Sequence, residues 1–97
     1  MFSERWSDQA MEDYENITHY LIKKWSEKEA LAFITKTEQI VQMICQMPKM
    51  FPGSIIYLGA RRAVLSKHHT LYYRILERTI EIITIFDNRQ SKEKINI

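Results

Sequence analysis

Apolar residues change their spacing near the middle of this 97-residue sequence, and this change limits the possible folds more than any other feature. Early in the chain they recur three and four positions apart, which is the spacing of one face of an α-helix. These positions are Met11, Tyr14, Ile17, Leu21, Ile22 and Trp25. Ser7 stands at a suitable N-cap position, followed by acidic residues near the positive end of the helix dipole. We therefore predict an amphipathic helix of roughly five turns.

A second helix is predicted to follow the first almost without a loop. Ser26 and Glu29 have the spacing of a capping box, which begins a helix, and Pro48 ends it. The apolar stripe of this helix consists of Ala30, Phe33, Ile34, Thr37, Ile40, Val41 and Ile44. Because the connection is so short, we expect an antiparallel helical hairpin that buries both stripes in one core.

The chain becomes extended after the Pro and Gly residues of the segment 47–53. We predict a strand at Ile55–Leu58 that bends or bulges at Gly59 and continues as Arg62–Ser66. Two more strands are predicted at Leu71–Leu76 and Thr79–Phe86, joined by a tight turn at Glu77-Arg78. Thr79–Phe86 is apolar on both faces, which favours a central position in the sheet. Residues 1–6 are too few to assign by pattern and could form an edge strand, and the polar tail 91–97 is expected to fray.

This order of elements predicts an α+β fold in which an N-terminal helical hairpin packs on one face of a small antiparallel β-sheet. The length suits a single domain over residues 1–97, and 45% apolar with 27% charged residues is a globular composition. No apolar run approaches the ~20 residues of a membrane-spanning helix. The charged N-terminal segment does not look like a secretory signal, and Cys45 has no second cysteine to pair with. These features favour a cytoplasmic protein.

Most signatures of enzymes are missing from the sequence. It contains no Gly-rich phosphate loop and no metal-ligand spacing, so we expect no metal and no cofactor. Cys45 lies beside the second apolar stripe and is interpreted as a core residue. His68 and His69 are adjacent and should point to opposite faces of a strand. They could act as acid and base near pH 7, but a polar entry to the sheet is the favoured interpretation.

Positive charge is concentrated in the second part of the chain. Residues 1–54 hold six Lys/Arg and eight Asp/Glu (−2), whereas residues 55–97 hold eight and four (+4). The basic residues singled out are Arg61, Arg62, Lys67, Arg74, Arg78 and Arg89. Arg62, Arg74 and Arg89 could share the sheet face left open by the helices and form a basic surface for phosphates. An ordinary solvated sheet face is the equally weighted alternative.

Three stretches together resemble a known family. They are RWSDQAMEDYENITHYL, WSEKEALAFITKTEQIVQMICQMPKMFPG and RRAVLSKHHTLYYRILERTIEIITIFDNRQ, which together span about residues 5–92. Their order and spacing resemble the RelE/ParE toxins of bacterial type II toxin–antitoxin systems, also described as plasmid stabilisation proteins. The resemblance implies an antiparallel sheet covered by two N-terminal helices. It also implies a partner, a cognate antitoxin that wraps the toxin and silences it.

The resemblance implies two alternative mechanisms. RelE-like members cleave mRNA on the ribosome through attack by a ribose 2′-hydroxyl, and they place a Tyr or a His–Tyr pair after the last strand. This chain has Asp87–Ser91 there, and Thr70 where ribonuclease members often place an arginine. The departure favours the ParE-like branch, whose members bind and poison DNA gyrase without running a reaction. A toxin that is inactive and only binds its antitoxin is a third interpretation.

Each mechanism implies its own set of functional residues. For binding to the gyrase target the set is Arg61, Arg62, Arg74 and Arg89. For an atypical ribonuclease the catalytic set is Arg62, Lys67, His68, His69, Arg74 and Arg89.

Overall fold

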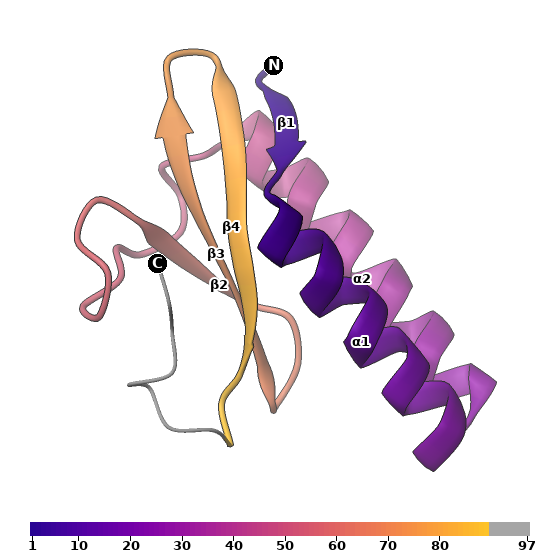
Figure 1. Ribbon diagram of the computed structural model, residues 1–97. Helices are drawn as coiled ribbons and strands as arrows, with labels where there is room; N and C mark the ends of the chain where they lie inside the picture. Colours follow the sequence, from indigo (N-terminus) through magenta and orange to yellow (C-terminus); the bar gives the residue numbers. More distant parts are fainter. Residues whose placement is uncertain (90–97) are drawn as a thin grey trace.

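Two helices lie side by side against one face of a four-stranded sheet, which makes a two-layer α+β arrangement (Figure 1). The computed structural model describes residues 1–89. In chain order the elements are β1 (Ser3–Trp6), α1 (Asp8–Lys24), α2 (Glu27–Gln46), β2 (Arg61–Val64), β3 (His69–Leu76) and β4 (Thr79–Asp87). The predicted fold class is confirmed. No helix in the described part of the chain is long and apolar enough to cross a membrane.

Both helices begin where the sequence predicts. The Ser7 hydroxyl accepts a hydrogen bond from the Ala10 N–H at 2.9 Å and so caps α1. The Ser26 hydroxyl accepts one from the Glu29 N–H at 3.2 Å and caps α2. Each bond satisfies one of the N–H groups that a helix leaves without an internal partner at its start.

The core is built mainly from α2 and the two long strands. The stripe of α2 is buried as predicted apart from Ile34, which is half-buried, and Cys45 is a core residue. The predicted stripe of α1 is too wide, because Met11, Ile22 and Trp25 are exposed. The side of α1 that contacts the core runs instead through Ala10, Tyr14, Ile17 and Leu21. This face is narrower because α1 lies along the part of β4 that β1 does not pair with, so that only one side of the helix contacts the sheet.

The strand order is β1-β4-β3-β2, so β4 is central, as predicted, and β1 is an edge strand. β1 runs parallel to β4, whereas the β2–β3 and β3–β4 pairs are antiparallel. The sheet is therefore mixed, and the expectation of a wholly antiparallel sheet is wrong. The reason is the helical hairpin: it carries the chain away from β1 so that β4 can pair beside it in the same direction.

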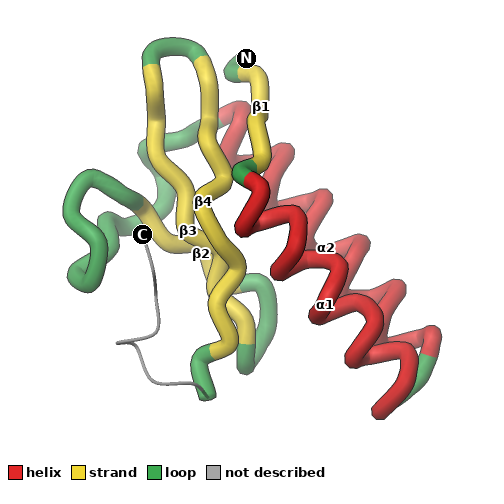
Figure 2. Tube along the Cα trace, in the orientation of Figure 1, coloured by secondary structure: helices red, strands yellow, loops and turns green. Residues whose placement is uncertain are grey.

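The predicted strand at Ile55–Leu58 is wrong. This segment belongs to the loop between α2 and β2 (Figure 2), and the Ile55 and Leu58 side chains are 88% and 91% exposed. The Ser54 hydroxyl accepts hydrogen bonds from the N–H groups of residues 56 and 57 at 3.2 and 3.1 Å. These bonds satisfy two backbone N–H groups within a local turn, so these groups do not require hydrogen-bond partners in a neighbouring strand.

The ends of the later strands also differ from the prediction. β2 begins at Arg61 and ends at Val64, while β3 begins two residues before Leu71. No bulge forms at Gly59, and the irregularity in the sheet lies between Tyr72 and Tyr73. The tight turn at Glu77-Arg78 is confirmed. The predicted fraying of the tail 91–97 concerns residues outside the described range.

α1 continues the sheet edge beyond the end of β1. The Ser7 N–H donates to the Ile82 carbonyl at 3.0 Å, and its hydroxyl donates to the Ile83 carbonyl at 2.6 Å. Six residues further along, Asp13 Oδ2 accepts the Ile85 N–H at 3.1 Å. Polar groups at the edge of β4 are thus paired with α1, which fixes the position of the helix on the sheet.

Candidate functional site

A pocket of about 500 Å³ opens between the helical hairpin and the β2–β3 loop, and it gathers several predicted site residues. Its lining comprises Tyr20, Leu21, Trp25, Glu29, Ala32, Phe33, Lys36, Leu65, Ser66, Lys67, His68, His69 and Arg89. Lys67, His68, His69 and Arg89 belong to the predicted ribonuclease set. Tyr20 and Lys36 are additions that sequence reasoning missed. We refer to this site as the basic pocket.

His69 is buried in the wall of the basic pocket. Its Nδ1 lies 2.9 Å from the Ser66 hydroxyl, and its ring packs edge-on against Phe33 with centroids 5.3 Å apart. Burial lowers the pKa of His69, opposed by the nearby Asp87 carboxylate. The imidazole is therefore neutral near pH 7 and ties the β2–β3 loop to the core. It is a buried polar group at the start of β3, in line with the favoured structural interpretation.

His68 lies in the loop before β3, so the two histidines do not alternate across a strand. Both line the same pocket, which corrects the expectation that they point to opposite faces. The His68 backbone is held on both sides: its N–H donates to Ser66 Oγ at 3.3 Å, and its carbonyl accepts from the Asn88 N–H at 2.7 Å. The half-buried imidazole makes no hydrogen bond with any residue from 1 to 89. Of the two histidines, His68 is the one available to a ligand.

Arg89 enters the basic pocket already paired with Asp87. Its Nε and Nη2 donate to the two carboxylate oxygens of Asp87 at 2.9 and 2.7 Å. These hydrogen bonds lower the pKa of Asp87 to about 2. The bidentate pair offsets much of the positive charge that Arg89 would otherwise offer to an anion.

The remaining predicted arginines lie away from the basic pocket. Arg74 Nε donates to Glu81 at 2.5 Å, and Arg5 donates to the same carboxylate at 2.9 Å, forming a row of charges across β1, β4 and β3. Burial opposes the ionised form of Glu81, but the bonds from Arg74 and then Arg5 outweigh it and lower its pKa. Arg74 is therefore largely neutralised.

Arg61 and Arg62 are neighbours on β2, but only the Arg61 side chain forms hydrogen bonds within the described residues. Arg61 donates to the carbonyls of Lys49 and Phe51 at 3.3 and 2.6 Å, so it anchors the α2–β2 loop. Arg62 is exposed beside Tyr72, its partner in the register, and forms no ion pair with any described residue. Of the arginines predicted to contact a target, Arg62 is the one whose side chain forms neither an ion pair nor a hydrogen bond with residues 1–89.

The sequence contains weak signals for some of the residues that were missed. Glu81 is the only charged residue within Thr79–Phe86, and its position opposite Arg74 follows from the register. Tyr20 and Lys36 come from two helices and meet the β2–β3 loop only through packing. Residues 1–89 contain no group of three or more His, Cys, Asp or Glu side chains that could hold a metal ion.

The arrangement of elements is shared with solved structures of RelE/ParE-type toxins. A chromosomal ParDE toxin–antitoxin structure from P. aeruginosa has a TM-score of 0.75 at 21% identity, covering 90% of this chain and 96% of that chain. A YoeB/ParE toxin from Agrobacterium tumefaciens has a TM-score of 0.65 at 14% identity, covering 88% and 96%. The E. coli DinJ–YafQ complex has a TM-score of 0.64 at 11% identity, covering 92% and 96%. At these identities the likeness establishes the fold alone, so the class that it defines is a fold class, that of RelE/ParE-type structures.

The sequence narrows this class to one family. The family model described as the ParE toxin of type II toxin-antitoxin system, parDE, matches residues 5–91. The chain therefore belongs to the ParE toxin family, as its resemblance indicated. Comparison with curated proteins gives no match.

Proposed function

We propose that this protein is a ParE-like toxin that inhibits DNA gyrase by binding to it, and that a cognate antitoxin neutralises it. Membership of the ParE family supports the ParE-like branch. Several structures with the same fold are toxin–antitoxin systems or complexes, which supports an antitoxin partner here. The proposal implies that the protein acts in the bacterial cytoplasm.

The observation that carries the proposal is that three of the six residues of the predicted ribonuclease set are already engaged by neighbouring side chains. Cleavage through a ribose 2′-hydroxyl needs an available base, an available acid and a cation near the phosphate. His69 is buried against Ser66, Arg74 is paired with Glu81, and Arg89 is paired with Asp87. These contacts favour a binding function over catalysis.

The basic pocket supports ribosome-dependent cleavage of mRNA as a second candidate function. It places the half-buried His68 near Lys67, with Tyr20 and Lys36 on the facing helices. An imidazole and a phenol could exchange protons, and two lysines could stabilise a phosphate. This arrangement uses only two of the six residues predicted for the ribonuclease and adds two others, so it is the less favoured candidate.

Two purified reactions distinguish these functions. Toxin is added to DNA gyrase on relaxed plasmid and, separately, to ribosomes carrying a defined mRNA. We expect supercoiling to be lost while the mRNA remains intact. His68→Ala should inhibit gyrase as well as wild type, and His19→Ala, an exposed helix histidine outside the basic pocket, is the matched control. Cleavage of the mRNA that disappears with His68→Ala, but not with His19→Ala, would overturn the proposal.

The contribution of the sheet face to target binding is tested by Arg62→Ala. Because the charge of Arg62 is exposed and forms no ion pair within the described residues, we expect the substitution to weaken gyrase inhibition several-fold. Arg78→Ala, which removes an exposed charge in the β3–β4 turn, is the control and should have little effect. Equal effects would show that overall charge, and not this surface, determines binding.

Expression in a bacterium without an antitoxin separates an active toxin from an inactive one. Pulse-labelled DNA synthesis should fall before protein synthesis, and co-expression of the cognate antitoxin should restore growth. An earlier fall in protein synthesis would favour the ribonuclease. No growth defect would favour a protein that only binds its antitoxin.

A further inference from the structure

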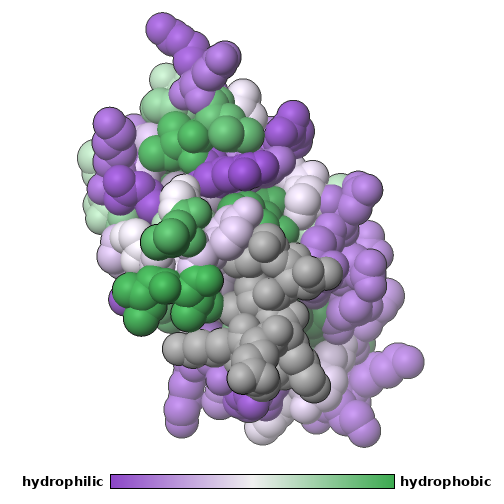
Figure 3. All heavy atoms as spheres, turned by 60° about the vertical axis from the view of Figure 1, so that its left-hand side comes forward, coloured by the Kyte–Doolittle hydropathy of each residue, from purple (hydrophilic) through white to green (hydrophobic). Residues whose placement is uncertain are grey.

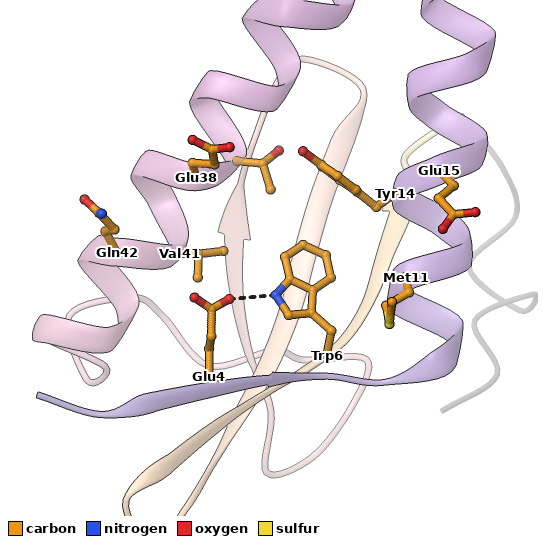
Figure 4. Close-up of a pocket in the computed structure, with 9 residues that line it drawn as sticks. Glu4, Trp6, Met11, Tyr14, Glu15, Glu38, Val41 and Gln42 are labelled. Carbon is orange, nitrogen blue, oxygen red and sulfur yellow. Dashed lines mark hydrogen bonds between the residues drawn. The ribbon is translucent and has the colours of Figure 1, made fainter.

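A second pocket, of about 510 Å³, lies where β1 meets the two helices and is not used by the proposed function (Figure 4). Its apolar wall combines Trp6 from β1, Met11 and Tyr14 from α1, and Val41 from α2. The rings of Trp6 and Tyr14 are 5.4 Å apart at an interplanar angle of 61°. Three elements thus present an aromatic surface in one concave site, which we call the aromatic pocket.

Carboxylates surround this apolar surface. Glu4, Glu15 and Glu38 line the aromatic pocket from β1, α1 and α2 respectively, and no Lys, Arg or His side chain is among its lining residues. Tyr14 and Glu38 line the same pocket, and burial and then the charge of Glu38 raise the pKa of Tyr14. None of the three glutamates forms an ion pair within residues 1–89. The pocket therefore carries negative charge that the described part of the chain does not compensate.

Trp6 is held in a fixed position. Its Nε1 donates to Glu4 Oε2 at 2.7 Å (Figure 4), and its ring packs against Tyr14. The preceding residue, Arg5, points its guanidinium to Glu81 on the sheet and does not enter the pocket. A pre-positioned indole loses little side-chain entropy when a ligand packs on it.

The chemistry that fits this site is a cation on an apolar stem. A guanidinium can stack on an indole or phenol ring and donate paired hydrogen bonds to a carboxylate, while its methylene groups contact apolar surface. A bare metal ion would leave the aromatic wall without a partner. The pocket opens between the two helices, and Met11 at its edge is half-exposed. An apolar residue next to the cation in the ligand could therefore also pack against this edge of the pocket.

We propose that the aromatic pocket binds an arginine side chain presented, next to apolar residues, by a partner polypeptide. The positive charge of an arginine complements the three glutamates, and its methylene groups and apolar neighbours fit the apolar wall beside them. The site is separate from the basic pocket and from Arg62, so it does not depend on gyrase being the target.

The test uses the full-length protein carrying Trp25→Phe, so that Trp6 is the only indole. Trp25 is 68% exposed and lines the basic pocket but not the aromatic pocket, so its replacement should not disturb the site. The probe is the peptide acetyl-Leu-Arg-Leu-amide, and the matched control peptide has neutral citrulline in place of arginine. The indole N–H resonance of Trp6 is followed by NMR during each titration.

We expect a saturable shift of the indole resonance with the arginine peptide and at least fivefold weaker binding of the citrulline peptide. Glu38→Gln should weaken arginine-peptide binding, whereas Glu12→Gln, which removes an exposed charge of α1 outside the pocket, should not. Retained dispersion of the other resonances shows that each variant is folded.

Four results would overturn the proposal. They are no shift with the arginine peptide, equal binding of the citrulline peptide, equal weakening by Glu12→Gln and Glu38→Gln, and equal binding of free arginine or tetramethylammonium. The second would indicate a purely apolar groove, and the third a general electrostatic effect. The fourth would indicate a site for small cations.

Discussion

At the scale of single residues, Tyr73 joins the sheet to the segment that follows α2. Its side chain is fully buried, and its hydroxyl donates to the buried Pro48 carbonyl at 2.5 Å. Tyr73→Phe should lower the free energy of unfolding by about 1–3 kcal/mol, because the carbonyl loses its partner. Urea denaturation measures this loss. Tyr57→Phe, in the α2–β2 loop, is the control and should change stability by less than about 0.5 kcal/mol.

The same hydroxyl predicts how stability depends on alkaline pH. Burial raises the pKa of Tyr73 from 10.0 to about 12, with Arg61 opposing the shift. A pKa raised on folding stabilises the protein below pH 10, and this contribution is lost as the pH rises toward 12. Denaturation curves recorded across that range should therefore fall more steeply for wild type than for Tyr73→Phe. Parallel curves for the two proteins would contradict the assignment.

At the scale of elements, the edge of β4 depends on one carboxylate of α1. Asp13 Oδ2 accepts both the Ile85 N–H and the Thr84 hydroxyl. Asp13→Ala should lower the free energy of unfolding by about 1–3 kcal/mol, because a partly buried N–H is left unpaired. It should also speed hydrogen exchange at Ile85. Glu12→Ala removes a carboxylate from the exposed side of the same helix and should do neither.

The β3–β4 turn contains a strained residue that a substitution can relieve. Glu77 has φ of 56°, in the left-handed region that costs an ordinary residue about 1–2 kcal/mol. Glu77→Gly removes this cost but adds backbone entropy to the unfolded chain, so a net gain of about 0.5–1 kcal/mol is expected. Thermal denaturation would register it as a higher Tm. Arg78→Gly, at a position without positive φ, should give no gain.

At the scale of the whole molecule, apolar residues divide between a core and an outer surface. Figure 3, which faces the side bearing β2 and the loop before it, shows apolar side chains gathered on that surface. Ile55 and Leu58 are almost fully exposed, whereas Leu71 on β3 is fully buried. Replacing both Ile55 and Leu58 by Ser should change the free energy of unfolding by less than about 0.5 kcal/mol. Leu71→Ala should cost about 2–5 kcal/mol in the same denaturation measurement. A large loss from the double variant would mean that the loop contributes to the core.

The sequence by itself determined the elements whose signals are local. The hydroxyls of Ser7 and Ser26 cap their helices by accepting hydrogen bonds from N–H groups three residues further along, and the apolar spacing of α2 identifies its buried face. The two long strands β3 and β4 follow from a largely apolar run that is interrupted at Glu77-Arg78, where the turn forms. Family membership also rests on the sequence alone. The preference for DNA gyrase, which began with the residues after the last strand, stays a prediction.

Only the tertiary structure decided features that depend on residues far apart in the chain. Among these are the parallel pairing of β1, the loop at Ile55–Leu58, the pairing of Arg5 and Arg74 with Glu81, and the lining of both pockets. The composition of Ile55–Leu58 suits a strand, yet this segment lies in an exposed loop. Which one forms depends on where the backbone N–H and C=O groups find partners. Those partners, like the charges that neutralise an arginine, are determined only when the layers pack.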